Sequence, residues 1–480
     1  MREGATAPRL RIPSMSWTLQ DVLAATGGGA APSAARQSVF TSVSTDSRQV
    51  EPGGIFFALR GPRYDGHDFV AEALRRGAAA AVVEQVATGT DPQRVVHVPD
   101  ALRALGDLAA WTRVREAVRV VAVTGSNGKT TTKEMIAAIC AAARLPPPRT
   151  AVLKTEGNFN NLIGLPLTLL RLRGDEAVAV LEMGMNRPGE IARLTEIARP
   201  DGAVVTNIAP AHLQGVGGTL AGVAAAKAEL FAGLSAGAGI AVNLDDAWVR
   251  RVAETFSGRT VTFGDGGEVR ARDVVDLGSD GVAFDLLIGD RSARIRLPFI
   301  GRHNVDNAVA AASVGALLNL DLEVIAAGLQ RTVRPAMRME VERLRNGVTV
   351  INDAYNANPS SVEAALVALR RFSGRSMVVL GEMWELGDES GRAHRAIGAR
   401  AATLGVQHVF LLGEHAEDVA AGAREAGMQA EAIHVCGSHA EVAVAVGSRW
   451  QPGDALLVKG SHGMRMDEVV RLLEDMGNSP

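Results

Sequence analysis

The chain has 480 residues, of which 47% are hydrophobic and 21% charged, a composition typical of globular proteins and too apolar for an intrinsically disordered chain. The chain has 50 Lys and Arg and 53 Asp and Glu, so its formal net charge is −3. This near-neutral charge argues against non-specific electrostatic binding of nucleic acid. Cys140 and Cys436 cannot form a disulfide framework, and no apolar run reaches the ~18 residues of a membrane span. Met1–Pro13 has no apolar signal region, so we expect a frayed tail there. We therefore expect a cytoplasmic enzyme of about three domains, at roughly 150 residues each.

The first domain is predicted to span residues 1–116 and to be a small α/β module. Gly27–Gly29 ends an N-terminal helix, and short apolar runs between turn residues indicate strands. The expected helices are Trp17–Thr26, Asp68–Arg76 and Leu102–Val114, and the expected strands are Ile55–Leu59 and Ala78–Val83.

The second domain, residues 117–332, is predicted to be a P-loop-type ATPase domain with a mostly parallel sheet. Val118–Thr124 is nearly all apolar, as in a strand buried on both faces, and the helix after it runs to Leu145, where Pro146–Pro148 stops it. Strands that alternate with helices favour parallel pairing. Val269–Phe299 alternates apolar and polar residues, which predicts antiparallel strands appended to the sheet. The other expected elements are strands Ala177–Met183, Ala203–Ile208 and Ile240–Leu244 and helix Asn304–Leu320.

The third domain, residues 333–480, is predicted to be a doubly wound α/β domain with a dinucleotide-fold-like topology. Asn346 and Gly347 between two apolar runs predict a hairpin of Met337–Leu344 and Val348–Asp353. Ser360 and Glu363 predict a capping box for a helix that ends at Phe372. The expected strands are Met377–Gly381, Val409–Leu412, Ile433–Val435 and Ala455–Lys459.

The segment Thr124–Thr130 (TGSNGKT), called the phosphate loop below, carries the clearest chemical signal. It lies between a buried strand and a helix, where backbone N–H groups and the helix N-terminus favour phosphate. Lys129 is expected to reach the β- and γ-phosphates and the Thr130 hydroxyl to bind Mg²⁺. The glycines of the usual phosphate-loop pattern are five residues apart, whereas Gly125 and Gly128 are three apart. A plain glycine turn with an exposed lysine is the alternative.

Three further side chains are weaker candidates for metal binding. Glu182 ends a buried strand and His212 follows the next strand end, which suits Mg²⁺ ligands, although a solvated Glu and a structural His are the alternatives. Lys227 lies in an Ala-rich helix and by its pattern alone is a surface lysine. Two amide-rich segments could recognise a polar ligand or could form turns: Lys154–Asn161 and Asn352–Pro359.

Together these segments resemble the Mur ligase family, the ATP-dependent amide ligases of peptidoglycan precursor synthesis. The family shares the shortened phosphate loop, and the resemblance covers essentially the whole chain. Within the family, the branch that adds D-alanyl-D-alanine to UDP-N-acetylmuramoyl-tripeptide is most similar. That similarity is carried by Asp353–Pro359 (DAYNANP), Gly381–Gly387 (GEMWELG) and Val458–Ser461 (VKGS), while Thr45–Arg48 (TDSR) and Asp65–Phe69 (DGHDF) resemble the uridine-nucleotide module.

The resemblance implies a role for each matching residue. It implies ATP binding by Gly125, Ser126, Asn127, Gly128, Lys129, Thr130, Thr131, Asn304 and Asp353, and catalysis by Lys129, Glu182, His212, Lys227 and Arg338. It implies Mg²⁺ binding, by two ions, at Thr130, Glu182, His212 and Lys227, the last as a carbamate formed with CO₂. The expected substrate contacts are Ser47, Arg48, Thr155, Asn158, Asn160, Asn161, Asn356 and Asn358, of which the last two face the incoming dipeptide.

The implied reaction is amide formation through an acyl phosphate, with closure of the third domain over ATP. The expected partners are only UDP-MurNAc-tripeptide and D-alanyl-D-alanine, with no nucleic acid and no membrane span, and the chain is expected to be a monomer. Three alternatives stay open: another Mur-type ligase that adds the third residue, a folylpolyglutamate synthase, and a nucleotide-regulated binding protein.

Overall fold

The computed structural model describes residues 16–31, 39–86, 90–143 and 147–478. The predicted tail Met1–Pro13 and the predicted helix end at Leu145 lie outside these residues. The chain divides into two compact units, which are described separately. Unit 1 comprises residues 1–122, 144–183 and 192–201, and unit 2 comprises residues 123–143, 184–191 and 202–480. The domain limits inferred from the sequence stay predictions.

The N-terminal module of unit 1 is the expected α/β module, built on a five-stranded sheet. Its strand order is β2-β7-β6-β5-β4, in which β4 to β7 pair parallel and β2 pairs antiparallel with β7. Phe56, Val70 and Val83 lie in the hydrophobic core of this sheet. The strands are β2 (Gly29–Ala30), β4 (Val43–Ser44), β5 (Ile55–Phe57), β6 (Ala80–Val83) and β7 (Val95–His97), and a separate pair joins β1 (Trp17–Thr18) to β3 (Val39–Phe40). The helices are α1 (Leu19–Thr26), α2 (Val70–Arg75) and α3 (Ala101–Glu116).

The rest of unit 1 places the first amide-rich segment beside a buried strand end. Strands β9 (Ala151–Lys154) and β10 (Glu176–Glu182) pair parallel, and α5 (Gly164–Leu169) packs against α3. Helix α6 (Glu190–Ala198) contributes Arg193, which donates to Asp107 of α3 at 2.5 Å. Strand β8 (Arg119–Thr124) leads the chain into unit 2.

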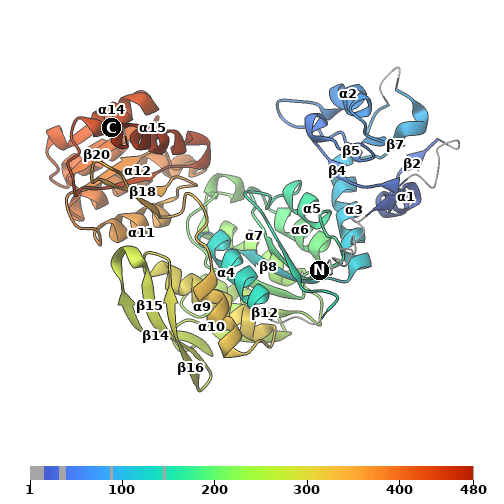
Figure 1. The fold of residues 1–480 in the computed structure, drawn as a ribbon, viewed down its shortest axis with the longest axis horizontal. Coiled ribbons are helices and arrows are strands. Elements are labelled where there is room, and N and C mark those ends of the chain that lie inside the picture. Colours follow the sequence, from blue (N-terminus) through green and yellow to red (C-terminus); the bar gives the residue numbers. More distant parts are fainter. Residues whose placement is uncertain (1–15, 32–38, 87–89, 144–146, 479–480) are drawn as a thin grey trace, which may run out of the picture. The chain divides into compact units, whose positions relative to one another are not determined.

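Unit 2 opens with the phosphate loop and continues as the predicted parallel sheet. Strands β11, β12 and β13 pair parallel. A single parallel pairing, Phe263 with Val269, then attaches three antiparallel strands, as the alternating pattern predicts. These are β14, β15 and β16 (yellow in Figure 1). The elements are α4 (Lys129–Ala142), β11 (Gly202–Val205), α7 (Leu220–Ala232), β12 (Gly239–Asn243), α8 (Ala247–Ala253), β13 (Arg259–Phe263), β14 (Val269–Asp276), β15 (Val282–Ile288), β16 (Arg291–Leu297), α9 (His303–Leu317) and α10 (Leu322–Arg331).

The C-terminal part (orange to red in Figure 1) has the predicted doubly wound topology, with strand order β17-β18-β22-β19-β20-β21. All pairs are parallel except the hairpin β17–β18. Successive strand residues face opposite cores: Val378 packs with α11 to α13, whereas Met377 packs with α14 and α15. The elements are β17 (Glu340–Arg343), β18 (Thr349–Asp353), α11 (Pro359–Leu369), β19 (Ser376–Leu380), α12 (Ser390–Thr403), β20 (His408–Leu412), α13 (Ala416–Glu425), β21 (Ile433–Cys436), α14 (His439–Gly447), β22 (Ala455–Lys459) and α15 (Asp467–Gly477).

The expected α/β class and mostly parallel sheets are thus confirmed, but the predicted capping box of α11 is wrong. The N-cap is Asn358, whose side chain accepts from the Ser361 backbone while Ser361 bonds back to Asn358. Pro359 starts the helix because it lacks an N–H and its φ is already helical. The helix therefore begins before Ser360, and Ser360 and Glu363 do not form its cap.

Candidate active site

The phosphate loop is shaped by two glycines that no other residue could replace. Gly125 has φ +147° and Gly128 has φ +79°. A Cβ at Gly125 would lie 1.9 Å from the Thr206 hydroxyl oxygen, and one at Gly128 would lie 2.1 Å from the Asn307 amide oxygen. Positive φ and this close approach both favour glycine at the two positions, and the binding of phosphate here stays a prediction.

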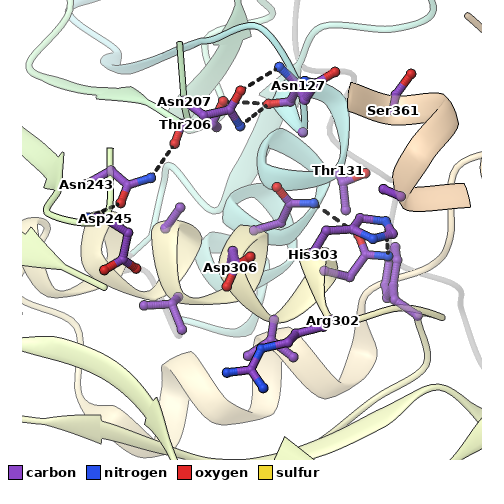
Figure 2. A pocket seen from close by; sticks show the side chains of 18 of the residues that line it. Asn127, Thr131, Thr206, Asn207, Asn243, Asp245, Arg302, His303, Asp306 and Ser361 are labelled. Atoms are coloured by element: carbon purple, nitrogen blue, oxygen red, sulfur yellow. Dashed lines mark hydrogen bonds between the residues drawn. The ribbon is translucent and has the colours of Figure 1, made fainter. Parts of the chain in front are cut away.

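A second loop, Thr206–Ala209, holds the phosphate loop in place. The Thr206 hydroxyl donates to the Asn127 carbonyl at 2.6 Å, and the Asn127 N–H donates to the Asn207 side chain at 3.0 Å. The Ser126 hydroxyl donates to the Ala209 carbonyl at 2.8 Å. Figure 2 shows Asn127, Thr206 and Asn207 meeting in this way. The loop that would hold phosphate is therefore preorganised.

The Lys129 side chain folds over the phosphate loop. Its Nζ donates to the Gly125 carbonyl at 2.8 Å and to the Ser126 carbonyl at 3.2 Å. The next residue, Thr130, accepts from Arg338 Nη2 at 2.9 Å, although the two residues are 208 positions apart in the sequence. The geometry thus places a lysine, a hydroxyl and an arginine around one phosphate-sized space.

That space opens onto a cavity of about 650 Å³, called the nucleotide cavity, which is within the range of small-molecule sites. Figure 2 shows Arg302, which precedes α9, with His303 and Asp306 of α9 on one side and Thr131 and Ser361 on another. Burial lowers the pKa of His303, which favours the neutral ring. Other predicted nucleotide ligands line it as well: Asn127, Gly128, Asn304, Arg338 and Asp353.

Asn304 is buried and held at both ends of its amide. Its Nδ2 donates to the Ile300 carbonyl at 2.8 Å, and its Oδ1 accepts from Asn307 at 3.0 Å. These bonds fix the side chain in the wall of the nucleotide cavity. The predicted contact with adenine stays a prediction.

The C-terminal part supplies a buried ion pair to the site. The Lys459 ammonium donates to the Asp353 carboxylate at 2.6 Å and to the Asn356 carbonyl at 2.9 Å, and both side chains are largely buried. Asp353 also accepts from the Met339 N–H at 3.1 Å. Removing either charge would leave the other buried without its partner, which is strongly destabilising. Lys459 thereby fixes the strand end that carries Asp353.

Asn356 and Asn358, the predicted contacts of the dipeptide, differ in their hydrogen bonds. Asn358 caps α11, and its Nδ2 also donates to Asn127 Oδ1 of the phosphate loop at 2.7 Å. Asn356 is exposed and accepts the Ala357 N–H at 2.9 Å. Asn358 therefore links the C-terminal part to the phosphate loop, whereas Asn356 faces outward. Contact of either residue with a dipeptide stays a prediction.

Lys227 is the largest departure from what the pattern of its helix predicts. It lies on α7, and its side chain is only 1% exposed, so the reading as a surface lysine is wrong. Burial, together with the nearby Lys129 ammonium, lowers its pKa well below the usual value of a lysine. A buried amine near the phosphate loop is thus favoured in its neutral, nucleophilic form.

Glu182 lies at a buried strand end in unit 1, and its exposed fraction is 2%, so a solvated surface Glu is excluded. Asn160 Nδ2 donates to its carboxylate at 2.8 Å, and the Glu182 N–H donates to the Thr155 hydroxyl at 2.9 Å. Asn161 accepts from the Ile163 and Gly164 N–H groups and so shapes the start of α5, while Asn158 is exposed. The segment therefore both orients Glu182 and forms a turn.

His212 is paired with a residue far along the chain. Its Nδ1 contacts the carboxylate of Glu385, and the hydrogen bond from His212 lowers the pKa of that carboxyl. Both residues have left-handed backbones, with φ +56° and +65°. Such a conformation is strained for residues other than glycine and concentrates at functional sites. The Glu385 carboxylate fixes the orientation of the His212 ring, just as carboxylates orient the rings of metal-binding histidines in other proteins.

Among the residues that the structure describes, no three His, Cys, Asp or Glu side chains form a ready-made metal site. The predicted donors nevertheless have suitable chemistry for Mg²⁺, which prefers few protein oxygens and keeps waters and phosphates. Thr130 offers a hydroxyl oxygen, and Glu182 offers a buried carboxylate that accepts from Asn160 at 2.8 Å. Each of these groups thus has the chemistry of a magnesium ligand, and their joint binding of an ion stays a prediction.

Several residues that build the site had no role predicted from the sequence: Thr206, Asn207, Tyr355, Glu385 and Lys459. Lys459 could have been found, because it is the one charged residue of the otherwise apolar strand Ala455–Lys459. Arg338 stacks over the ring of Tyr355 at 4.2 Å, a contact for which the sequence contains no signal.

Ser47 and Arg48 follow β4 in the N-terminal module. Ser47 is buried, while the Arg48 guanidinium is 77% exposed and makes a two-bond contact with Asp46 at 2.9 and 2.8 Å. An exposed guanidinium held in one orientation suits a phosphate ligand.

Comparison with known proteins matches three successive parts of the chain to models of one family. Three family models match: "Mur ligase family, catalytic domain" over residues 39–113, "Mur ligase middle domain" over 123–315 and "Mur ligase, glutamate ligase domain" over 337–462. No helix in the described part of the chain combines the length and the hydropathy needed to cross a bilayer.

Curated relatives align over nearly the whole chain. UDP-N-acetylmuramoyl-tripeptide–D-alanyl-D-alanine ligase of Escherichia coli is 37% identical, with coverage of 91% of this chain and 94% of the relative. The protein of that name from Bacillus subtilis is 36% identical, with coverage of 92% and 94%.

Solved structures show the same similarity. A MurF structure from Acinetobacter baumannii has a TM-score of 0.88 at 33% identity, covering 96% of this chain and all of that one. A MurF ligase from Thermotoga maritima in complex with ADP has a TM-score of 0.80 at 30% identity, covering 91% of this chain and 97% of that one.

Proposed function

Because the chain belongs to the Mur ligase family, we propose that it joins D-alanyl-D-alanine to UDP-N-acetylmuramoyl-tripeptide at the expense of ATP. The products would be the UDP-MurNAc-pentapeptide, ADP and phosphate. The observation that carries this proposal is the contact of the phosphate loop with Arg338 and Asn358, beside a cavity large enough for a nucleotide. The names of the relatives at 36 and 37% identity support the choice of substrates.

The chemistry explains why the site needs a phosphate loop. A carboxylate resists attack by an amine because oxide is a poor leaving group. Transfer of the γ-phosphoryl group to the tripeptide carboxylate breaks the bond to ADP and gives an acyl phosphate. The dipeptide amine then attacks the acyl carbon, and phosphate leaves after the amine has lost a proton. Enzymes promote such phosphoryl transfer mainly by positioning and by charge stabilisation.

In this reaction, the polar groups around the phosphate loop would stabilise charge, position other residues and exclude water. Lys129 and Arg338 would stabilise the charge that develops on the transferred phosphoryl group. The Asp353–Lys459 pair fixes the strand end next to Tyr355, over which Arg338 stacks. The bond from Asn358 to Asn127 would help exclude water from the acyl phosphate.

The proposal includes magnesium and a carbamate on Lys227. Magnesium, when bound, would neutralise phosphate charge, with Thr130, Glu182 and His212 as protein ligands. CO₂ reacts with a neutral amine, and the lowered pKa of Lys227 favours that form. A carbamate would convert this buried amine into a carboxylate-like ligand. We further propose a cytoplasmic location, where ATP and nucleotide-linked precursors are available, and a monomeric state.

The substrate choice predicts which amine drives phosphate release. With ATP and UDP-MurNAc-tripeptide present, release should depend on D-alanyl-D-alanine and be weak with D-alanine, L-lysine or diaminopimelate at equal concentration. A site that pairs with the amide of a dipeptide rejects ligands that lack it. The measurement is phosphate release combined with the product mass. Faster turnover with a single amino acid would assign the chain to another branch of the family, and phosphate release that needs no amine would favour a nucleotide-regulated protein.

The N-terminal module should bind the uridine-nucleotide end of the acceptor. Arg48→Ala is expected to raise the KM for UDP-MurNAc-tripeptide about tenfold, because one charge-assisted bond to phosphate is worth roughly 1.5 kcal/mol or more. The KM for ATP should not change. Arg103→Ala is the matched control, since Arg103 is also an exposed arginine paired with an aspartate, Asp107, in the same module. An unchanged acceptor KM in Arg48→Ala would refute the assignment.

A further inference from the structure

Arg338 enters the site from a segment whose backbone is strained on both sides of it. Met337 has φ +56° and Met339 has φ +52°, in the left-handed region that residues other than glycine seldom adopt. Such a residue persists only where its surroundings hold it in place. Two strained residues that flank one arginine indicate that the fold fixes the direction of the arginine side chain.

Hydrogen bonds hold this segment against the end of β18 and the turn that follows. The Met339 N–H donates to the Asp353 carboxylate at 3.1 Å. The Tyr355 N–H donates to the Met337 carbonyl at 3.2 Å. These bonds hold the backbone on either side of Arg338 next to Tyr355, although the two segments are separated along the chain by the β17–β18 hairpin.

The Arg338 guanidinium lies over the ring of Tyr355. Its carbon Cζ is 4.2 Å from the ring centroid, well within the ~6 Å over which a cation and an aromatic ring attract each other. This is the shortest of the three such contacts in the described part of the chain. Both side chains are partly buried, which strengthens the attraction because less water screens the charge.

Hydrogen bonds to the protein do not by themselves fix the plane of the Arg338 guanidinium. Its Nη2 donates to the Thr130 hydroxyl at 2.9 Å. Its Nε is buried and has no hydrogen-bond partner among the residues that the structure describes. A guanidinium carries several N–H donors in a planar fork, and one bond leaves that fork able to rotate. The ring of Tyr355 therefore sets the plane, and the remaining N–H groups stay available to a ligand.

Tyr355 and Arg338 face the same space beside the phosphate loop. A cavity of about 70 Å³ is lined by both residues together with Ser126–Thr130 of the phosphate loop. The Tyr355 ring also lies against the His462 ring, with the two centroids 5.5 Å apart, which restricts the tyrosine side chain. The stacked pair thus stands where the γ-phosphoryl group would be transferred.

We propose that Tyr355 is a positioning residue for phosphoryl transfer, whose ring holds the Arg338 guanidinium in the plane in which it meets the transferred group. This inference rests on the proposed ligase function and goes beyond it, because it gives a role to a residue that acts through Arg338. A charge that is oriented before the reaction needs no reorganisation when negative charge develops on the phosphoryl group. Loss of the ring should therefore lower kcat and leave substrate binding largely unchanged.

Steady-state kinetics on the full chain distinguish the Tyr355 ring from its hydroxyl. Tyr355→Leu should lower kcat about tenfold, the order expected for a partly desolvated contact of this kind, with little change in the KM of any substrate. Tyr355→Met, a second variant without a ring, should show the same loss and guards against misfolding of Tyr355→Leu. Tyr355→Phe should keep nearly the wild-type kcat, because it retains the ring.

The matched control is Trp248→Leu. It removes an aromatic ring that lies 5.7 Å from the guanidinium of Arg251, a pair on α8 that does not reach the phosphate loop. Its kcat should equal that of the wild type. The unfolding temperature of every variant is measured alongside, and a loss of kcat counts only in variants that unfold close to the wild-type temperature.

Combination with Arg338→Ala tests whether the ring acts through the guanidinium. Arg338→Ala and the double variant Arg338→Ala/Tyr355→Leu should have the same kcat, because the ring has nothing left to position. Guanidinium chloride at a concentration that does not denature the protein should restore part of the activity of Arg338→Ala by stacking on Tyr355, and little of the activity of the double variant. A merely structural role would give additive losses and equal rescue.

The results separate this inference from the proposed function. If the wild type forms no pentapeptide from ATP, UDP-MurNAc-tripeptide and D-alanyl-D-alanine, the proposed function fails. If the wild type forms it and the variants without a ring keep the wild-type kcat, the inference fails while the function stands. An equal loss of kcat in Tyr355→Phe and Tyr355→Leu would assign the role to the hydroxyl and would also overturn the inference.

Discussion

Lys129→Ala is expected to reduce ATP-dependent product formation at least 10²-fold to 10³-fold, because loss of one aligned charge at a transition state costs about 3 to 4 kcal/mol. The Lys129 ammonium lies over the phosphate loop, where it is held by the Gly125 and Ser126 carbonyls. A γ-phosphoryl group bound there would meet this charge directly. Product formation is measured by the appearance of the pentapeptide mass under saturating substrates.

The control variant is Lys129→Arg, which keeps the charge but replaces a compact ammonium with a planar fork. It should recover only part of the activity, since the loop geometry is matched to lysine. Both variants should unfold at nearly the wild-type temperature, because the loop is also held by Thr206 and Asn207. Near-normal kcat in Lys129→Ala would refute the assignment of this segment as a phosphate loop.

Lys227 is the second position at which a large effect is expected. Lys227→Ala should lose most of the activity and regain part of it when short carboxylates such as acetate or formate are added. The physical reason is that the proposed carbamate presents carboxylate-like oxygens to magnesium, and a small carboxylate can enter the space left by the side chain. Activity should also fall when the wild type is depleted of CO₂ and return with bicarbonate.

Lys227→Met separates the chemical role from packing, because methionine fills a similar volume without an amine. It should fold at least as stably as the wild type, since burial of an ammonium is costly. A ¹³C signal of a carbamate should appear in wild-type protein supplied with labelled bicarbonate and be absent from Lys227→Met. Full activity of Lys227→Met without added carboxylate would contradict the role.

Local features of this protein were predictable from the sequence alone. The strand before Gly125 and the helix after Gly128 are adjacent along the chain, so their periodicity and glycines were enough to indicate a phosphate loop. The hairpin at Asn346–Gly347 and the alternating strands within Val269–Phe299 were predictable for the same reason. The capping box of α11 was wrong because Asn358 followed by Pro359 competes with the Ser360 pattern and is the stronger start signal.

Only the tertiary structure decided which distant side chains share the site. Arg338 reaches Thr130 across 208 residues and Lys459 reaches Asp353 across 106, and no local pattern encodes such pairs. Lys227 shows the reason most clearly. An Ala-rich helix with one lysine has no apolar stripe that marks its buried side, so its sequence predicted a surface residue, and packing alone buried the amine. Sequence periodicity determines local elements because their hydrogen bonds are local, whereas burial and ion pairing depend on what the folded chain brings together.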